Sequence, residues 1–136
     1  MFDSRFEVLN ALASGFERHG LTVTVDPDTI CVGREQWDTY SKQILMMLSA
    51  APAIKEGDKT FNLFAIEQYD SDNKLTKYSI KLCDAKKNEL KSWDLDTKRG
   101  QHTHLYSDNG KEPPHIPFDG SITNIVADII EFMRMY

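Results

Sequence analysis

Two pairs of residues that could do chemistry stand close together in the sequence: Asp94 with Asp96, and His102 with His104. Side chains two residues apart lie on the same face of a β-strand, so each pair shares a face if its segment is extended. The segment between the pairs, residues 97–101, is polar and contains a glycine, which is typical of a hairpin connection. In the antiparallel register that we expect from this connection, Asp96 faces His102 and Asp94 faces His104.

Such a patch suits acid–base catalysis, because histidine titrates near neutral pH and a facing carboxylate orients its ring and raises its pKa. With one imidazole as base and another as acid, these groups suit cleavage of RNA by attack of the 2′-hydroxyl group. A cation would neutralise the phosphate in the transition state. The candidate catalytic residues are His102, His104, Asp94 and Asp96, and the candidate substrate-binding residues are Lys98, Arg99 and His115.

The same segment supports other interpretations. A His-x-His pair on a strand can supply two imidazoles to one divalent metal ion, and a facing carboxylate completes a set of three ligands: Asp96, His102 and His104. The sequence leaves open whether the cofactor is a divalent metal or none. His115, flanked by prolines, either closes over the hairpin or is an ordinary loop residue. A polar hairpin exposed to water also carries histidine and aspartate without any function.

Composition limits the class of protein. The chain has 136 residues, a net charge of −5 and 40% hydrophobic residues, which predicts a single domain over residues 1–136. No apolar run approaches the roughly 20 residues that span a bilayer, and no basic segment followed by an apolar one begins the chain, so we expect a cytoplasmic protein without a membrane partner. Cys31 and Cys83 lie in apolar, strand-like contexts, which predicts buried reduced thiols.

The periodicity of apolar residues predicts an α+β fold: an antiparallel β-meander with two N-terminal helices and one C-terminal helix packed on one face. Ser4 and Glu7 form a capping-box pattern before the first helix, and Ser121 precedes the last. The second helix is expected over residues 35–49. The expected strands are residues 21–25, 30–32, 61–69, 76–83, 89–96 and 102–106. Basic residues outnumber acidic ones between residues 74 and 111, which weakly favours nucleic acid as a partner.

The order of these features resembles the small TumE-like toxins of bacterial toxin–antitoxin modules. The likeness covers residues 61–135: strands, then the aromatic-Asp pair Trp93 and Asp94, then the histidine pair His102 and His104, then a closing amphipathic helix. The resemblance implies RNA as the substrate and a cognate protein that holds the toxin in check.

A non-catalytic interaction protein is the alternative to a ribonuclease. The net acidity and the lack of a Gly-rich phosphate loop, a His-Glu-x-x-His pair or a CxxC pair are compatible with an antitoxin, an immunity protein or a phage-encoded inhibitor. On this interpretation the acidic surface and the proline-rich loop at residues 107–120 bind another protein.

Overall fold

The computed structural model describes residues 2–33, 45–96, 100–105, 116–117 and 121–136, and at residues 96, 100–105 and 116–117 it describes the backbone. These residues form one nine-stranded sheet and two α-helices, which confirms the α+β class. The elements are α1 (Glu7–Arg18), β1 (Thr22–Thr24), the 3₁₀ helix η1 (Pro27–Thr29), β2 (Cys31–Gly33), β3 (Met46–Ala50), β4 (Ala53–Glu56), β5 (Lys59–Tyr69), β6 (Leu75–Cys83), β7 (Glu89–Asp96), β8 (Gly100–Leu105), β9 (Ile116–Pro117) and α2 (Ile122–Met135).

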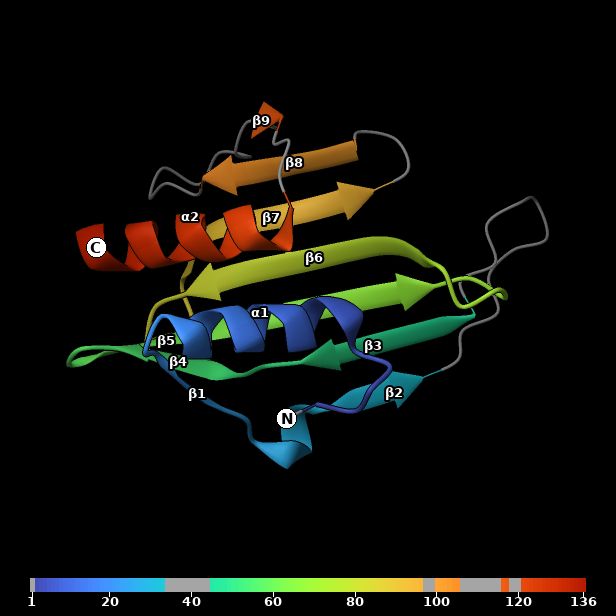
Figure 1. Ribbon diagram of the computed structural model, residues 1–136, viewed down its shortest axis with the longest axis horizontal. Helices are drawn as coiled ribbons and strands as arrows, with labels where there is room; N and C mark the ends of the chain where they lie inside the picture. The colour runs from blue at the N-terminus through green and yellow to red at the C-terminus, as the bar shows by residue number, and fades with distance from the viewer. Residues whose placement is uncertain (1, 34–44, 97–99, 106–115, 118–120) are drawn as a thin grey trace.

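Strand β5 organises the sheet. Its 11 residues pair along one edge with β4 at the beginning and with β3 at the end, while the other edge pairs with β6. From β5 the chain continues as the predicted antiparallel meander through β6, β7 and β8. Both helices lie on the same face of this sheet (Figure 1). Neither is long and apolar enough to cross a membrane.

The prediction of two N-terminal helices was wrong. Of the expected second helix, residues 46–49 belong to β3, which pairs with β2 and β5, and residues 35–44 lie outside the described residues. In the part of the chain that is described, α1 and α2 are the two α-helices. Methionine and leucine favour helices by intrinsic propensity. In the structure, however, Leu48 and Ala50 are buried and Ser49 between them is less so, and the segment pairs with β2 on one edge and with β5 on the other. These tertiary contacts outweigh the helix propensity.

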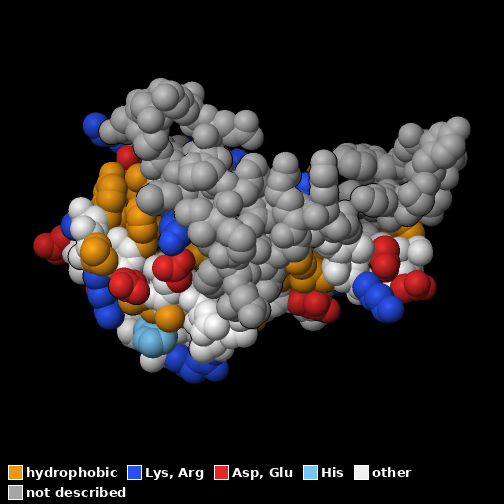
Figure 2. All heavy atoms as spheres, turned by 90° about the horizontal axis from the view of Figure 1, so that it is seen from above, with side chains coloured by type: hydrophobic (Ala, Val, Ile, Leu, Met, Phe, Trp, Pro, Cys, Tyr) orange, Lys and Arg blue, Asp and Glu red, His pale blue; other side chains and the backbone are white. Residues whose placement is uncertain are grey.

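The core lies between the helices and the sheet. Along β5 every second residue from Phe61 to Tyr69 is buried, as expected of a strand that faces a helical layer on one side. Strand β6 continues this pattern from Tyr78 to Leu82, so the intervening residues of β5 and β6 lie on the face of the sheet that points away from the helices. In β7 the neighbours Ser92 and Trp93 are both buried. The large, fully buried side chains include Phe6, Leu9, Leu12, Phe16, Leu48, Ile54, Phe61, Leu63, Tyr69, Ile80, Leu82 and Trp93. In the view from above, acidic and basic side chains of the described residues are interspersed with apolar ones (Figure 2).

The helices approach each other closely at Gly15 of α1. A Cβ atom at this position would lie 2.7 Å from Cγ2 and 3.2 Å from Cγ1 of Val126 in α2, which is closer than real Cβ contacts allow. The glycine therefore permits the close packing of α1 on α2.

Replacing Gly15 by alanine should lower the free energy of unfolding by about 1–2 kcal/mol, because overpacking outweighs the better helix propensity of alanine. In a Val126→Ala background the same change should be neutral or stabilising, since the clash is gone. Urea denaturation of the two single variants and the double variant measures this coupling. Equal effects of Gly15→Ala in both backgrounds would contradict the close contact.

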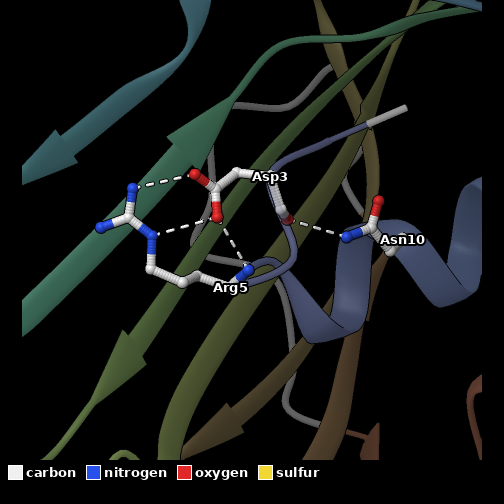
Figure 3. A network of polar contacts seen from close by, with 3 residues as sticks. All are labelled: Asp3, Arg5 and Asn10. Carbon is white, nitrogen blue, oxygen red and sulfur yellow. Dashed lines mark hydrogen bonds and ion pairs between the residues drawn. The ribbon is translucent and has the colours of Figure 1, made fainter.

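A network of polar contacts fixes the segment before α1 (Figure 3). The Asp3 carboxylate accepts hydrogen bonds from the Arg5 backbone N–H and from Nε and Nη2 of its guanidinium, at 2.9–3.0 Å. These bonds, the guanidinium first, lower the pKa of Asp3 to about 2. Asn10 Nδ2 donates to the Asp3 carbonyl, and Asn10 Oδ1 accepts from the Phe2 N–H. The segment thus folds back on the helix, and Phe2 is buried.

The expected capping box is absent. Helix α1 begins at Glu7, its N-cap is Phe6, and no side chain of the N-cap bonds to the helix. The caps come instead from β5, where the Glu67 carboxylate accepts from Val8 N at 2.9 Å and from Leu9 N at 3.1 Å. A strand of the sheet therefore satisfies the free N–H groups of the first helical turn, a task usually performed by a neighbouring residue.

Tyr69 completes this arrangement. Its hydroxyl donates to Glu67 Oε1 at 2.6 Å and accepts from Glu7 N at 3.3 Å. Glu67 is only 1% exposed, and its hydrogen bonds with Val8 N, Leu9 N and the Tyr69 hydroxyl are buried. Burial first, and then the Glu67 carboxylate, raise the pKa of the Tyr69 phenol well above its ordinary value of 10.0.

The β5–β6 and β6–β7 hairpins use the same turn. In each, an aspartate (Asp70 or Asp84) accepts side-chain hydrogen bonds from the backbone N–H groups two and four residues later. In each, the residue three positions after the aspartate has a positive φ, 59° at Asn73 and 66° at Lys87. Asparagine tolerates this left-handed conformation, and lysine does so at a cost.

Replacing Lys87 by glycine should therefore raise the free energy of unfolding by about 0.5–1 kcal/mol. Asn73→Gly is the matched control, because the same backbone conformation there already holds a tolerant residue, and it should change stability by less than about 0.5 kcal/mol. Thermal denaturation of both variants measures the difference. A gain for Asn73→Gly as large as that for Lys87→Gly would contradict the strain at Lys87.

The two cysteines differ in accessibility. Both are free thiols, but Cys83 is buried and Cys31 is exposed, so the prediction of burial was right for one and wrong for the other. Cys31 lies on β2, a three-residue strand whose residues are all exposed. Burial, followed by the nearby carboxylates of Glu89 and Asp84, raises the pKa of the Cys83 thiol.

A disulfide-exchange reagent at about pH 8 should therefore react with one thiol of the folded protein, Cys31, and reach Cys83 only after unfolding, because the thiolate is the reactive form. Absorbance of the released reagent counts the thiols, and Cys31→Ser should abolish the fast reaction. Fast reaction of both thiols in the native protein would contradict the assignment.

Candidate functional site

The candidate site lies on the β7–β8 hairpin, and its backbone register differs from the prediction. Asp94 pairs with His102, Ser92 pairs with His104, and Asp96 pairs with Gly100. The predicted pairings of Asp96 with His102 and of Asp94 with His104 were therefore wrong. The ladder continues to Gly100, so the connection spans residues 97–99 and is shorter than the five residues expected.

The shift is by two residues, so it changes partners without changing faces. Trp93, between Ser92 and Asp94, is fully buried and pairs with Ile80, which places it on the helical side of the sheet. Residues 92 and 94, and the positions 102 and 104 paired with them, therefore belong to the opposite face. By register, positions 94, 102 and 104 belong to one face, and in the backbone ladder Asp94 is directly opposite His102.

Ser92 is a candidate that sequence reasoning missed. Although it lies on the face away from the helices, it is fully buried, and its Oγ donates to Asp94 Oδ2 at 2.9 Å. The hydroxyl thus fixes one oxygen of the Asp94 carboxylate. The available signal was its spacing, since Ser92 precedes Asp94 by two residues and must share its face.

The remaining predicted site residues are not placed by the structure. The side chains of Asp96, His102 and His104 lie outside the described part, as do residues Lys98, Arg99 and His115 entirely. In the backbone register Asp96 pairs with Gly100, and the residue paired with His102 is Asp94, which was not in the expected set of metal ligands. Among the described residues there is no group of three histidine, cysteine or acidic side chains that could hold a metal ion.

Behind the site, a second cluster attaches α2 to β7. Asp128 Oδ2 accepts from the Trp93 indole Nε1 at 2.8 Å and from Lys91 Nζ at 2.9 Å. Lys91 Nζ also lies 5.3 Å from the centre of a Trp93 ring, within the range of a cation–π contact. Trp93 is fully buried, so these contacts fix the strand on which Ser92 and Asp94 stand. We assign them a structural role.

His19 is the one histidine whose side chain is described. It follows the last residue of α1 and is its C-cap, where its backbone N–H bonds to carbonyls of the last turn. This position belongs to the helical layer and not to the β7–β8 hairpin.

No protein-family model, no curated protein and no solved structure matches this chain. The resemblance to TumE-like toxins stays a prediction, and the function is argued from the geometry of β7 and β8.

Proposed function

We propose that the protein cleaves RNA and is the toxin of a toxin–antitoxin module. The observation that carries this proposal is the β7–β8 register, which pairs Asp94 with His102 and Ser92 with His104 on the face away from the helices. An aspartate anchored by a buried serine beside a histidine is an arrangement that orients an imidazole for proton transfer.

The reaction needs two proton transfers at one phosphate. In the proposed mechanism His102, oriented by Asp94, takes the proton of the 2′-hydroxyl as its oxygen attacks phosphorus. The bond from phosphorus to the 5′-oxygen breaks, and His104 donates a proton to that leaving oxygen. The products are a 2′,3′-cyclic phosphate and a free 5′-hydroxyl. Residues two apart on a strand stand about 7 Å apart, which lets two imidazoles flank one phosphate.

Incubation of the purified protein with mixed RNA, with and without a chelator, tests the proposal. Cleavage should occur and should be lost in a His102→Ala/His104→Ala variant. His19→Ala is the matched control, because it removes a histidine from the helical layer, and it should cleave at the parental rate. Absence of cleavage in both conditions, or equal cleavage by the double variant, would refute the proposal. A divalent metal requirement would appear as loss of activity with the chelator.

The alternative, a non-catalytic protein that binds another protein, makes a different prediction. It expects no cleavage and a partner that co-purifies from lysate at moderate salt. A small neighbouring antitoxin gene would favour the toxin, and neighbouring phage or defence genes would favour an inhibitor.

A further inference from the structure

The face that carries Asp94 extends in register from β7 across β6 and β5. One row of paired positions runs from His104 through Ser92 and Lys81 to Phe64. A second row, two residues along each strand, leads from His102 through Asp94 to two further positions, Ser79 and Ile66.

This continuation presents both apolar and cationic side chains to solvent. Ile66 is 39% exposed, which is unusual for a large apolar residue in the middle of a central strand. Phe64 is partly exposed beside it in the adjacent row. Lys77 is exposed and pairs with Gln68, and the Lys81 side chain is 39% exposed. Surfaces that bind single-stranded nucleic acids combine cations, which contact the phosphates, with aromatic rings, on which the bases stack. Here Phe64 supplies the ring, and Ile66 adds apolar surface next to it.

The distances fit a strand of RNA that extends from the proposed site. Neighbouring strands lie about 4.8 Å apart, so Lys81 stands about 10 Å from position 104, and Phe64 stands one strand further. A nucleotide bound over β7 and β8 would thus have its neighbours over β6 and β5. A duplex hides the faces of its bases and could not use Ile66 or Phe64 in this way.

We propose that the face of the sheet formed by Phe64, Ile66, Lys77 and Lys81 is a binding surface for single-stranded RNA, with bases against Ile66 and Phe64 and phosphates at Lys77 and Lys81. The proposal rests on the proposed function, because it extends the substrate outward from Asp94 and His102. Lys81 now pairs with Glu89 Oε1 at 3.1 Å in a solvent-exposed ion pair. Exposed ion pairs are weak, so a phosphate can compete with the Glu89 carboxylate for the Lys81 ammonium group.

Binding is best measured without turnover. Fluorescence anisotropy with a labelled 12-nucleotide single-stranded RNA of mixed sequence, and with the corresponding duplex, is followed at several salt concentrations using the His102→Ala/His104→Ala protein. The single strand should bind more tightly than the duplex. Lys77→Gln and Lys81→Gln should each weaken binding and reduce the slope of log K against log salt by about 0.7, the value for one phosphate contact with a single strand.

Three further variants separate the contributions. Ile66→Ser should weaken binding several-fold with an unchanged salt slope, because it removes an apolar contact and no charge. Glu89→Gln should strengthen binding, since it removes a carboxylate that competes with the phosphate for Lys81. Arg18→Gln is the matched control on α1, an exposed cation of the helical layer whose loss should change neither affinity nor slope.

The outcomes distinguish this surface from the catalytic proposal. Single-strand binding with the expected losses, but no cleavage by the parent protein, would support the surface and refute the catalysis. Lysine variants that behave like Arg18→Gln would overturn the surface, even if RNA is cleaved. Equal binding of the duplex together with no effect of Ile66→Ser, or no binding of either RNA at low salt, would also overturn it, and the last result would favour the protein-binding alternative.

Discussion

Replacing Glu67 by leucine should lower the free energy of unfolding by about 3–4 kcal/mol, although the change makes a core strand more apolar. The carboxylate accepts hydrogen bonds from Val8 N, Leu9 N and the Tyr69 hydroxyl, and it is 1% exposed. Leucine would leave these donors buried without acceptors, and an unsatisfied buried donor costs about 1–3 kcal/mol. That cost exceeds what leucine gains by burial.

Urea denaturation followed by circular dichroism measures this effect. Glu67→Gln should cost less than Glu67→Leu, because one oxygen still accepts while the amide nitrogen meets a second donor. Glu131→Leu, which removes an exposed carboxylate from α2, is the matched control and should change stability by less than about 0.5 kcal/mol. Hydrogen exchange at the amides of Val8 and Leu9 should accelerate in Glu67→Leu. An unchanged unfolding midpoint would show that the cap contributes nothing.

Asp94→Asn should lower the rate of RNA cleavage by about 10²-fold or more, because a neutral amide neither orients His102 nor stabilises its cation. Asp96→Asn is the matched control on the same strand and face. Asp96 pairs with Gly100, so this variant should retain most of the activity. Ser92→Ala should have an intermediate effect, since it removes the hydrogen bond that holds Asp94 and leaves the carboxylate in place.

Initial rates of cleavage measured across a range of pH, together with histidine titration by NMR, check this ranking of the three variants. The titration midpoint of His102 should fall in Asp94→Asn, because an opposite charge is lost, and should be unaffected by Asp96→Asn. Equal effects of the two aspartate variants on rate and titration would mean that the pairing of Asp94 with His102 has no chemical consequence.

The sequence predicted those elements that depend on interactions between residues close together in the chain. The alternation of apolar and polar residues predicted the strands of the meander, β5, β6 and β7. The 3.6-residue period of apolar residues predicted α1 and α2. The hairpins at residues 70–73 and 85–88 carry polar turn residues, but the role of Asp84, whose side chain bonds to the backbone up to four residues later, is visible only in the structure.

The misses depended on contacts between distant residues. The composition of Met46–Ala50 favours a helix, but the segment forms a strand because it pairs with β2 and β5. The capping pattern at Ser4 was overridden by Glu67, whose place among the buried positions of β5 was the available signal. For the site, the sequence predicted the face shared by aspartates and histidines but not the register, since a shift by two residues leaves the hydrophobic pattern unchanged.

The cap on α1 has a consequence for how the chain is made. A 12-residue helix is marginally stable in water by itself, and the acceptor for Val8 N lies 59 residues further along the chain. During synthesis α1 leaves the ribosome first, yet its cap exists only after β5 has emerged. We therefore expect the nascent N-terminus to remain unstructured until Glu67 and Tyr69 are clear of the exit tunnel, and then to fold together with the central strand rather than ahead of it.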